Sequence, residues 1–378
     1  MKRILLVFGT RPEAIKMAPI VKALAQRQSI VDVGVCVTAQ HRQMLDQVLD
    51  FFSIVPRFDL NVMRERQSLS RLTADIIVGM EEVLKTFRPD LVLVHGDTTT
   101  SAIAALAAYY SQIPVGHVEA GLRTYRRYAP FPEEINRQLT GRIASWHFAP
   151  TDTARANLLR ESIAEDSVFV TGNTVIDALY WAKDMLVDYE DEEIAMLRRL
   201  LKPTKKLVLV TAHRRENLGK GLQEICGALL QIADQSDVQI VFPVHLNPVV
   251  QQTVNEYLGG HESIHLIKPL GYPAFTWLML NSHLIISDSG GIQEEAAGLG
   301  KPLLVMRDFS ERPEAIVAGL VRLVGTDGNL IYSEAIALLG ESGQEMTVGS
   351  SVYGDGRSAE RIADIVLNLL SSDDVIPR

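Results

Sequence analysis

The sequence predicts an α/β protein whose parallel sheets are divided between two domains. Short apolar runs alternate with longer helical patterns along the whole chain, which is typical of successive βαβ units. The 378 residues are enough for two domains, each with its own core. Between the two series of runs, the acidic stretch Val187–Glu193 is predicted to be an exposed helix or a connector.

The first half contains apolar runs bounded by Gly, Pro or polar residues, and each run is predicted to be a strand. These runs are Ile4–Phe8, Asp32–Thr38, Leu91–His95, Val115–Val118, Trp146–Ala149 and Val168–Val170. Helices are expected between them, for example at Pro12–Gln26, Arg42–Phe52, Leu69–Thr86 and Pro132–Ser145.

The second half repeats this alternation. Its predicted strands are Lys206–Thr211, Gln239–Pro243, Ile264–Lys268, Leu284–Ser287, Pro302–Val305 and Val321–Val324. We place the boundary at Gly172, soon after the last strand of the first half, so that residues 1–171 and 172–357 form the two domains.

Composition excludes several classes of function. A net charge of −9 argues against a general nucleic-acid-binding protein, because binding by counterion release requires a basic surface. No apolar run approaches the roughly 20 residues of a membrane span, and the run after Lys2-Arg3 is shorter than a signal-peptide core. Cys36 and Cys226 lie far apart in sequence and are predicted to be buried thiols. We therefore expect a cytoplasmic protein with no nucleic-acid or membrane partner.

A strand that turns sharply into a helix is predicted at Ser287–Ala297. The adjacent Gly290 and Gly291 allow close approach of an anion, and the amides of the first helical turn favour phosphate. Glu294 and Glu295 follow, where a carboxylate can accept hydrogen bonds from ribose hydroxyls. An ordinary βα turn with an acidic first turn is the alternative interpretation.

The segment Arg-Pro-Glu-Ala-Ile occurs twice, once after the first strand and once after a late strand. In each copy Pro suits the first helical position, and the preceding Arg is held at the mouth of the turn, where it can pair with phosphate. These arginines are Arg11 and Arg312, and Lys16 adds a positive charge one turn after Arg11. The repetition favours one ligand site with cationic groups from both halves.

Three carboxylates are candidates for acid–base chemistry at the carboxyl ends of the strands, where open parallel sheets bind ligands. Glu119 directly follows an apolar strand and is the hardest to explain structurally. Asp97 and Glu133 have structural alternatives, because Asp97 precedes a helix that it can cap and Glu133 lies in a predicted first helical turn.

Metal and nucleotide-cofactor motifs are missing from the sequence. There is no H-x-H or H-E-x-x-H pattern, no G-x-G-x-x-G and no Walker loop, so we expect neither a metal nor a cofactor. His213 is the histidine with a candidate role, because two arginines follow it and favour its neutral ring.

Five blocks of the sequence resemble the UDP-N-acetylglucosamine 2-epimerase family, in its non-hydrolysing bacterial branch. The blocks are Val7–Lys16, His95–Thr98, Gly116–Thr124, His213–Glu216 and Asp288–Glu295, and the resemblance continues to at least Gly354. It implies a glycosyltransferase-B-like architecture, in which two Rossmann-like domains face a cleft and the terminal helix, 358–378, returns to the first domain. It also implies a homodimer.

The resemblance implies reversible epimerisation of UDP-N-acetylglucosamine to UDP-N-acetylmannosamine without cofactor or metal. UDP leaves to give a bound 2-acetamidoglucal and then adds back. Catalysis is expected from Asp97, Glu119, Glu133 and His213, without an assignment of the carboxylate that removes the C2 proton. Substrate binding is expected from Arg11, Lys16, Arg137, Phe275, Ser289, Gly290, Gly291, Glu295 and Arg312.

Some family members bind a second, activating substrate molecule. Gln40, Gln43, Glu134, Arg214 and His245 are compatible with such a site, but Asp75 stands where the family pattern has Arg. Tyr125–Arg127 and Leu270 also depart from relatives. The alternative functions are a hydrolysing 2-epimerase, which releases UDP and free N-acetylmannosamine, and a glycosyltransferase of the same architecture.

Overall fold

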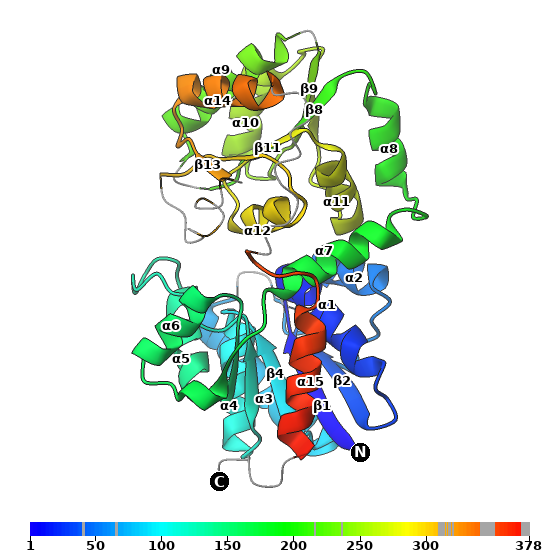
Figure 1. The fold of residues 1–378 in the computed structure, drawn as a ribbon, viewed down its shortest axis with the longest axis vertical. Helices are drawn as coiled ribbons and strands as arrows, with labels where there is room; N and C mark the ends of the chain where they lie inside the picture. Colours follow the sequence, from blue (N-terminus) through cyan, green and yellow to red (C-terminus); the bar gives the residue numbers. More distant parts are fainter. Residues whose placement is uncertain are drawn as a thin grey trace. The chain divides into compact units, whose positions relative to one another are not determined.

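The chain forms two compact α/β units, which Figure 1 shows as separate groups of helices around a sheet. Unit 1 comprises Met1–Tyr180 and Tyr353–Arg378, and unit 2 comprises Trp181–Val352. The computed structural model describes residues 1–39, 42–64, 67–214, 217–235, 237–308, 314, 316, 319, 321–340 and 352–371.

Unit 1 is built on a seven-stranded sheet in the order β3-β2-β1-β4-β5-β6-β7. All its neighbouring strands are parallel. The strands are β1 (Lys2–Phe8), β2 (Val31–Val37), β3 (Phe58–Asp59), β4 (Leu91–His95), β5 (Val115–Val118), β6 (Trp146–Ala149) and β7 (Val168–Val170). The helices are α1 (Arg11–Ala25), α2 (Arg42–Phe51), α3 (Leu69–Phe87), α4 (Thr99–Tyr110), α5 (Glu133–Ile143), α6 (Asp152–Arg160), the start of α7 (Thr174–Met185) and α15 (Ser358–Ser371).

Close packing of helices on the sheet explains the apolar strand sequences of unit 1. Leu5 of β1 lies opposite Gly34 of β2 in the parallel register, and both contribute to the face covered by α3 and α4. A Cβ atom at Gly34 would lie 2.9 Å from the Phe87 ring, so glycine allows α3 to approach the sheet. Helix α15, red in Figure 1, packs beside α1 on unit 1.

Unit 2 has a six-stranded sheet in the order β10-β9-β8-β11-β12-β13, again with parallel neighbours. The strands are β8 (Lys206–Thr211), β9 (Val238–Pro243), β10 (Ile264–Ile267), β11 (Leu284–Ser287), β12 (Leu303–Val305) and β13 (Val321–Leu323). Helices α9 (Lys220–Ala233), α10 (Pro248–Leu258) and α14 (Gly328–Gly340) share a buried apolar core with this sheet. The other described helices are α8 (Glu192–Leu200), α11 (Tyr272–Asn281) and α12 (Gly290–Gly298).

The predicted fold class is confirmed, because both sheets are parallel and their strands alternate with helices. Every predicted strand is present, with ends that agree within one residue except at the start of β1, which begins at Lys2 rather than Ile4. The two-residue strand β3 is missing from the prediction, because two residues carry no readable period. Cys36 and Cys226 are buried and free. No helix in the described part of the chain is long and apolar enough to cross a membrane.

The chain passes from unit 1 to unit 2 inside α7 rather than at Gly172. The first turns of α7 remain with unit 1 because Asp177 accepts a hydrogen bond from the N–H of Ala359, the second residue of α15, at 2.7 Å. The ring of Tyr180 also lies against Gly356, where a Cβ atom would come within 2.5 Å of it. The start of α7 is thus fastened to the start of α15.

Asp177 makes the stability of this contact depend on pH. Burial raises the pKa of Asp177 from an ordinary 3.8 to about 6, so the folded chain keeps this proton at pH values where the unfolded chain has released it. The free energy of unfolding should therefore fall by up to about 3 kcal/mol as the pH rises from about 4 to about 6. Urea denaturation across this range measures the change.

The matched control is Asp177→Asn, which keeps an oxygen acceptor for Ala359 and does not titrate. The free energy of unfolding of the wild type minus that of the variant should fall as the pH rises, and it should level off above about pH 6. Two parallel stability–pH curves would contradict the expectation.

Candidate active site

Both sheets reverse their strand order at their centre, and open parallel sheets bind ligands at such points. In unit 1 the reversal lies between β1 and β4, and in unit 2 it lies between β8 and β11. The segments that leave the carboxyl ends of these strands begin at Gly9, Gly96, Ala212 and Asp288. The predicted site residues Arg11, Asp97 and His213 therefore lie at or next to the reversal points.

Glu119 follows β5, the strand beside β4, and has a left-handed backbone with φ of 60°. Its side chain is 9% exposed. Oε1 accepts hydrogen bonds from Lys16 Nζ and, at 2.9 Å, from Asn173 Nδ2. Oε2 lies 3.8 Å from His95 Nε2. The structure thus brings Glu119 together with the predicted Lys16 in a nearly buried ion pair.

Asp97 follows β4 and is paired with the predicted Arg137 of α5. Arg137 Nε donates to Asp97 Oδ2 at 2.8 Å, and Asn136 Nδ2 donates to the Asp97 carbonyl at 2.9 Å. Glu133 lies one turn before Arg137 on the same helix. Its Oε2 is buried and accepts no hydrogen bond from a described residue. Two adjacent residues of α5 therefore hold Asp97. One carboxylate oxygen of Glu133 remains able to accept a hydrogen bond from a ligand.

Glu134 is fully buried and holds the preceding loop. Its carboxylate accepts hydrogen bonds from the N–H groups of Thr124 and Tyr125 at 3.0 and 3.1 Å, and from Gln138. Burial acts to raise the pKa of Glu134, but these donors and Arg137 outweigh it, so the pKa is lowered. A contact between Glu134 and a second substrate molecule would require these bonds to be exchanged.

Glu13, which was given no role in the sequence analysis, fixes the turn that carries Arg11. Its Oε2 accepts hydrogen bonds from the N–H groups of Gly9 and Thr10 at 3.0 and 2.8 Å, and its Oε1 accepts one from the Thr98 hydroxyl at 2.7 Å. Burial raises the pKa of Glu13 to about 7 against the effect of these donors. One side chain thus joins the turn after β1 to the turn after β4.

His213 of unit 2 is oriented by Asp288, whose role the sequence analysis also missed. His213 Nδ1 lies 2.9 Å from Asp288 Oδ1. Asp288 is fully buried and also accepts hydrogen bonds from the N–H groups of His213 and Arg214, both at 2.9 Å. Burial acts to raise the pKa of Asp288, but the interactions with His213 and the backbone donors outweigh it and lower the pKa. The Asp288 carboxylate holds His213 at the strand end through Nδ1, so Nε2 of His213 faces away from Asp288.

Two residues predicted for a second substrate molecule lie close to His213. The ring of His245 stacks on the ring of His213, with centroids 6.1 Å apart and an interplanar angle of 27°. Arg214 follows His213, and its Nε is buried without a hydrogen-bond partner among the described residues. In unit 1, Asp75 is engaged by Gln67 and Arg71, at 3.0 and 3.1 Å.

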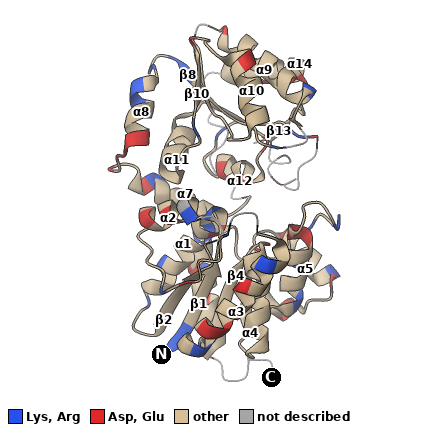
Figure 2. Ribbon diagram, turned by 180° about the vertical axis from the view of Figure 1, so that it is seen from behind, with Lys and Arg blue, Asp and Glu red and all other residues tan. Residues whose placement is uncertain are grey.

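The predicted phosphate turn is present at the start of α12. Ser289 is the N-terminal capping residue and uses no side-chain hydrogen bond to cap the helix. A Cβ atom built at Gly291 would have no heavy atom within 4 Å, so the helix start is open to an approaching group. Gly290 is buried beside it, and Glu295 and Phe275 are half-buried on α12 and α11. The acidic residues of α12 are marked in Figure 2.

Comparison with known proteins places the chain in a family. The sequence profile described as UDP-N-acetylglucosamine 2-epimerase matches residues 22–367. The UDP-N-acetylglucosamine 2-epimerase of Escherichia coli strain K12 is 54% identical over 371 residues, which cover 97% of this chain and 98% of that protein. The chain belongs to the UDP-N-acetylglucosamine 2-epimerase family.

Solved structures of this epimerase family share the fold. The UDP-GlcNAc 2-epimerase of Neisseria meningitidis, bound to UDP-GlcNAc, is 47% identical with a TM-score of 0.87, and the match covers 97% of this chain and 100% of that chain. The Methanocaldococcus jannaschii enzyme in complex with UDP-GlcNAc and UDP is 34% identical with a TM-score of 0.80, over 97% and 100% of the two chains. Family membership makes the chain an epimerase, as its motifs predicted.

Three predicted residues are described incompletely or not at all. Gln40 and Arg312 are outside the described residues, and the side chain of Gln43 is not described. Most of the second Arg-Pro-Glu-Ala-Ile segment also lies outside the described residues.

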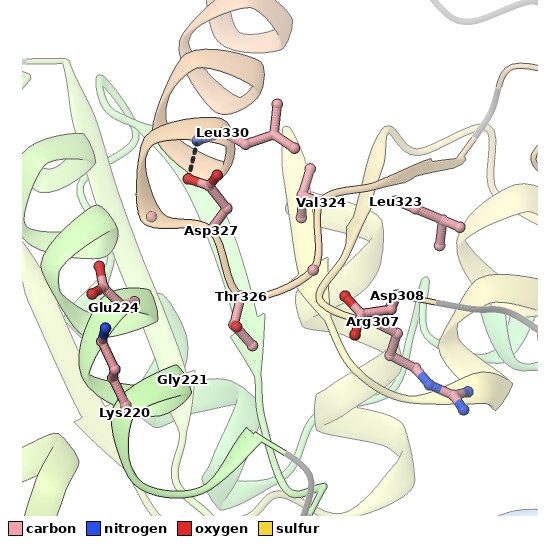
Figure 3. A pocket seen from close by; sticks show the side chains of 12 residues that line it. Lys220, Gly221, Glu224, Arg307, Asp308, Leu323, Val324, Thr326, Asp327 and Leu330 are labelled. Atoms are coloured by element: carbon pink, nitrogen blue, oxygen red, sulfur yellow. Dashed lines mark hydrogen bonds between the residues drawn. The ribbon is translucent and has the colours of Figure 1, made fainter.

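A cavity of about 820 Å3 in unit 2 lies apart from the predicted residues of the epimerase family. Figure 3 shows Lys220 and Glu224 of α9 on one side of it and Arg307 and Asp308, which follow β12, on the other. None of the predicted site residues lines it. Within the described ranges, no three His, Cys, Asp or Glu side chains are grouped so as to hold a metal ion.

Proposed function

We propose that the chain interconverts UDP-N-acetylglucosamine and UDP-N-acetylmannosamine by reversible epimerisation at C2, without net hydrolysis. The relatives carry the name of this epimerase, and those from Neisseria meningitidis and Methanocaldococcus jannaschii were solved with UDP-GlcNAc. The observation that carries the proposal is the group of carboxylates at the strand ends of unit 1. Glu119 and Asp97 each pair there with a cation, and Glu133 lies one turn before Arg137.

The chemistry of the substrate explains the need for several carboxylates. C2 has no neighbouring carbonyl, so its proton is too weakly acidic for direct removal. As the bond from C1 to the UDP oxygen breaks, positive charge at C1 makes the C2 proton acidic. Elimination gives 2-acetamidoglucal and UDP, and re-addition delivers a proton to C2 from the opposite face. Acid–base groups must therefore reach both faces of the ring.

We assign the sugar chemistry to unit 1. Asp97, Glu119 and Glu133 exchange protons with the sugar, while Lys16 pairs with Glu119 and Arg137 orients Asp97. Arg11, at the start of α1, stabilises the departing pyrophosphate.

We assign UDP binding to unit 2. The amides at the start of α12 with Ser289, Gly290 and Gly291 bind pyrophosphate, Glu295 binds ribose, and Phe275 contributes to the nucleoside site. His213, whose Nδ1–H faces the Asp288 carboxylate, acts as an imidazolium that donates a hydrogen bond from Nε2 to the leaving group. Arg312 is assigned to the same pyrophosphate by the sequence pattern.

We further propose a cytoplasmic homodimer that uses no cofactor and supplies UDP-N-acetylmannosamine for cell-envelope polysaccharides. Of the residues proposed to contact an activating second substrate molecule, His245 and Arg214 lie beside His213 in the part of the chain that the structure describes. Their place beside His213 supports this assignment.

Exchange with solvent tests the proposed reaction. Incubation with UDP-N-acetylglucosamine in D2O should give deuterium at C2 of both UDP-sugars, because the proton that returns comes from a group in contact with solvent. NMR spectra should show an equilibrium mixture in which the bond from UDP to the sugar is intact.

The rival functions give different products in the same tube. Accumulation of free N-acetylmannosamine and UDP would establish a hydrolysing epimerase. Absence of C2 exchange, with transfer of the sugar only when an acceptor is added, would establish a glycosyltransferase.

A further inference from the structure

Asn173 lies in the connection between β7 and α7 and contacts Glu119 across 54 positions of sequence. Its Nδ2 donates a hydrogen bond to Glu119 Oε1 at 2.9 Å. We propose that Asn173 is a positioning residue for the epimerisation, which fixes the orientation of the Glu119 carboxylate. This inference rests on the proposed function, because it concerns the same reaction.

The side chain of Asn173 has its orientation determined by its neighbours. Asn173 is 2% exposed, and its Oδ1 accepts a hydrogen bond from the Val175 N–H at 3.0 Å. The amide oxygen must face this N–H donor, so the NH2 group must face the carboxylate. A buried amide fixed at one end can present its donor to Glu119 in only one direction.

The backbone of Asn173 is fixed as well. Its N–H donates to the Tyr353 carbonyl at 2.6 Å, so the segment before α7 is bonded to the segment before α15. Gly172 allows this approach, since its φ is 87° and a Cβ atom there would lie 2.5 Å from Ser358 Oγ. The Asn173 amide that donates to Glu119 therefore projects from a backbone segment that is hydrogen-bonded to a second segment.

Glu119 requires such a support because its own backbone is in an uncommon conformation. A φ of 60° is unfavourable for a non-glycine residue. Lys16 supplies charge to Oε1, but its ammonium group sits on a flexible stem and sets direction poorly. The planar amide of Asn173 sets the direction in which the carboxylate points.

Misplacement of an acid–base group by about 1 Å can lower a rate about 100-fold. Loss of the Asn173 donor should therefore reduce turnover rather than substrate binding. The contacts proposed for UDP lie on other residues, namely Arg11 and the UDP-binding residues of unit 2.

The decisive variant is Asn173→Asp in the full-length chain. It keeps an oxygen acceptor for the Val175 N–H and replaces only the NH2 group that faces Glu119. The matched control is Asp177→Asn, the reverse isosteric change four residues further along, in the first turn of α7. Asp177 contacts Ala359 and not Glu119 in the described structure.

We expect Asn173→Asp to lower kcat for C2 exchange by about 10- to 100-fold, with KM for UDP-N-acetylglucosamine within about threefold of the wild type. The acid side of its pH–rate profile should move to higher pH, because a second carboxylate beside Glu119 favours the protonated form. Asp177→Asn should keep the wild-type kcat and the wild-type pH profile at pH values above about 7.

A second variant, Asn173→Ser, covers the case in which Asn173→Asp folds poorly. It is too short to reach Glu119 and adds no charge, so kcat should fall while the pH profile moves less. Circular dichroism establishes that each variant is folded.

Three results separate the inference from the proposed function. If the wild type shows no C2 exchange, both are wrong. If the wild type exchanges and Glu119→Gln does not, but folded Asn173→Asp has wild-type kcat, only the role of Asn173 is wrong. A fall in kcat with an unshifted pH profile, matched by an equal fall in Asp177→Asn, would show that Asn173 serves only to join the two segments.

Discussion

Glu119→Gln should reduce the rate of epimerisation by about 100- to 10,000-fold, which is the range for loss of a general acid or base. The amide has the size of the carboxylate but neither accepts nor releases a proton, and it removes the negative charge of Glu119 that faces Lys16. UDP affinity should remain within about threefold of the wild type. C2 exchange in D2O measures the rate, and titration calorimetry with UDP measures the affinity.

Glu161→Gln is the matched control for this variant. Glu161 also pairs with a buried cation, because it accepts hydrogen bonds from Arg123 at 2.7 and 2.8 Å, but it lies on the α6 side of unit 1. It should lose some stability and keep nearly all of its turnover. If Glu119→Gln turned over at nearly the wild-type rate, the catalytic assignment of Glu119 would be wrong.

His213→Ala should lower kcat by about 100- to 1,000-fold, because loss of a hydrogen-bond donor to a developing anion typically has that effect. KM should change less than kcat, since the donor acts mainly as negative charge develops on the leaving pyrophosphate. Steady-state assays at saturating and limiting UDP-N-acetylglucosamine separate the two quantities.

The chain offers a second histidine–aspartate pair as the control. His261 Nε2 lies 3.3 Å from Asp234 Oδ1, on residues with no proposed role. His261→Ala should therefore match the wild type in kcat and KM. Equal losses in both variants would show that His213 contributes only to stability.

The sequence was sufficient for the fold because each buried strand is apolar on both faces. Strands β8 and β11 are predicted to the residue, since polar residues begin where the strands leave the core. The same reasoning places Asp97, Glu119 and His213 at the carboxyl edges of their sheets. Site residues at strand ends are therefore accessible from pattern alone.

Residues that act through a distant partner were not predictable in this way. Asn173, Asp288 and Glu13 each bond to a segment that the chain reaches only through the folded sheet. The sequence also cannot distinguish a structural from a catalytic glutamate in the first turn of a helix. Glu133 has a buried oxygen without a described partner, whereas its neighbour Glu134 is saturated with donors.

The hydrogen bond from Asn173 to Tyr353 has a consequence for how this protein is assembled from modules. The chain leaves unit 1 in α7 and returns to it just before α15, so unit 2 has the topology of an insertion between these two helices. Insertions are accommodated where the two ends of the interrupted segment lie close together. A shortened chain in which a Gly/Ser linker replaces residues 181–352 would retain all seven strands of the first sheet and the helix that closes it.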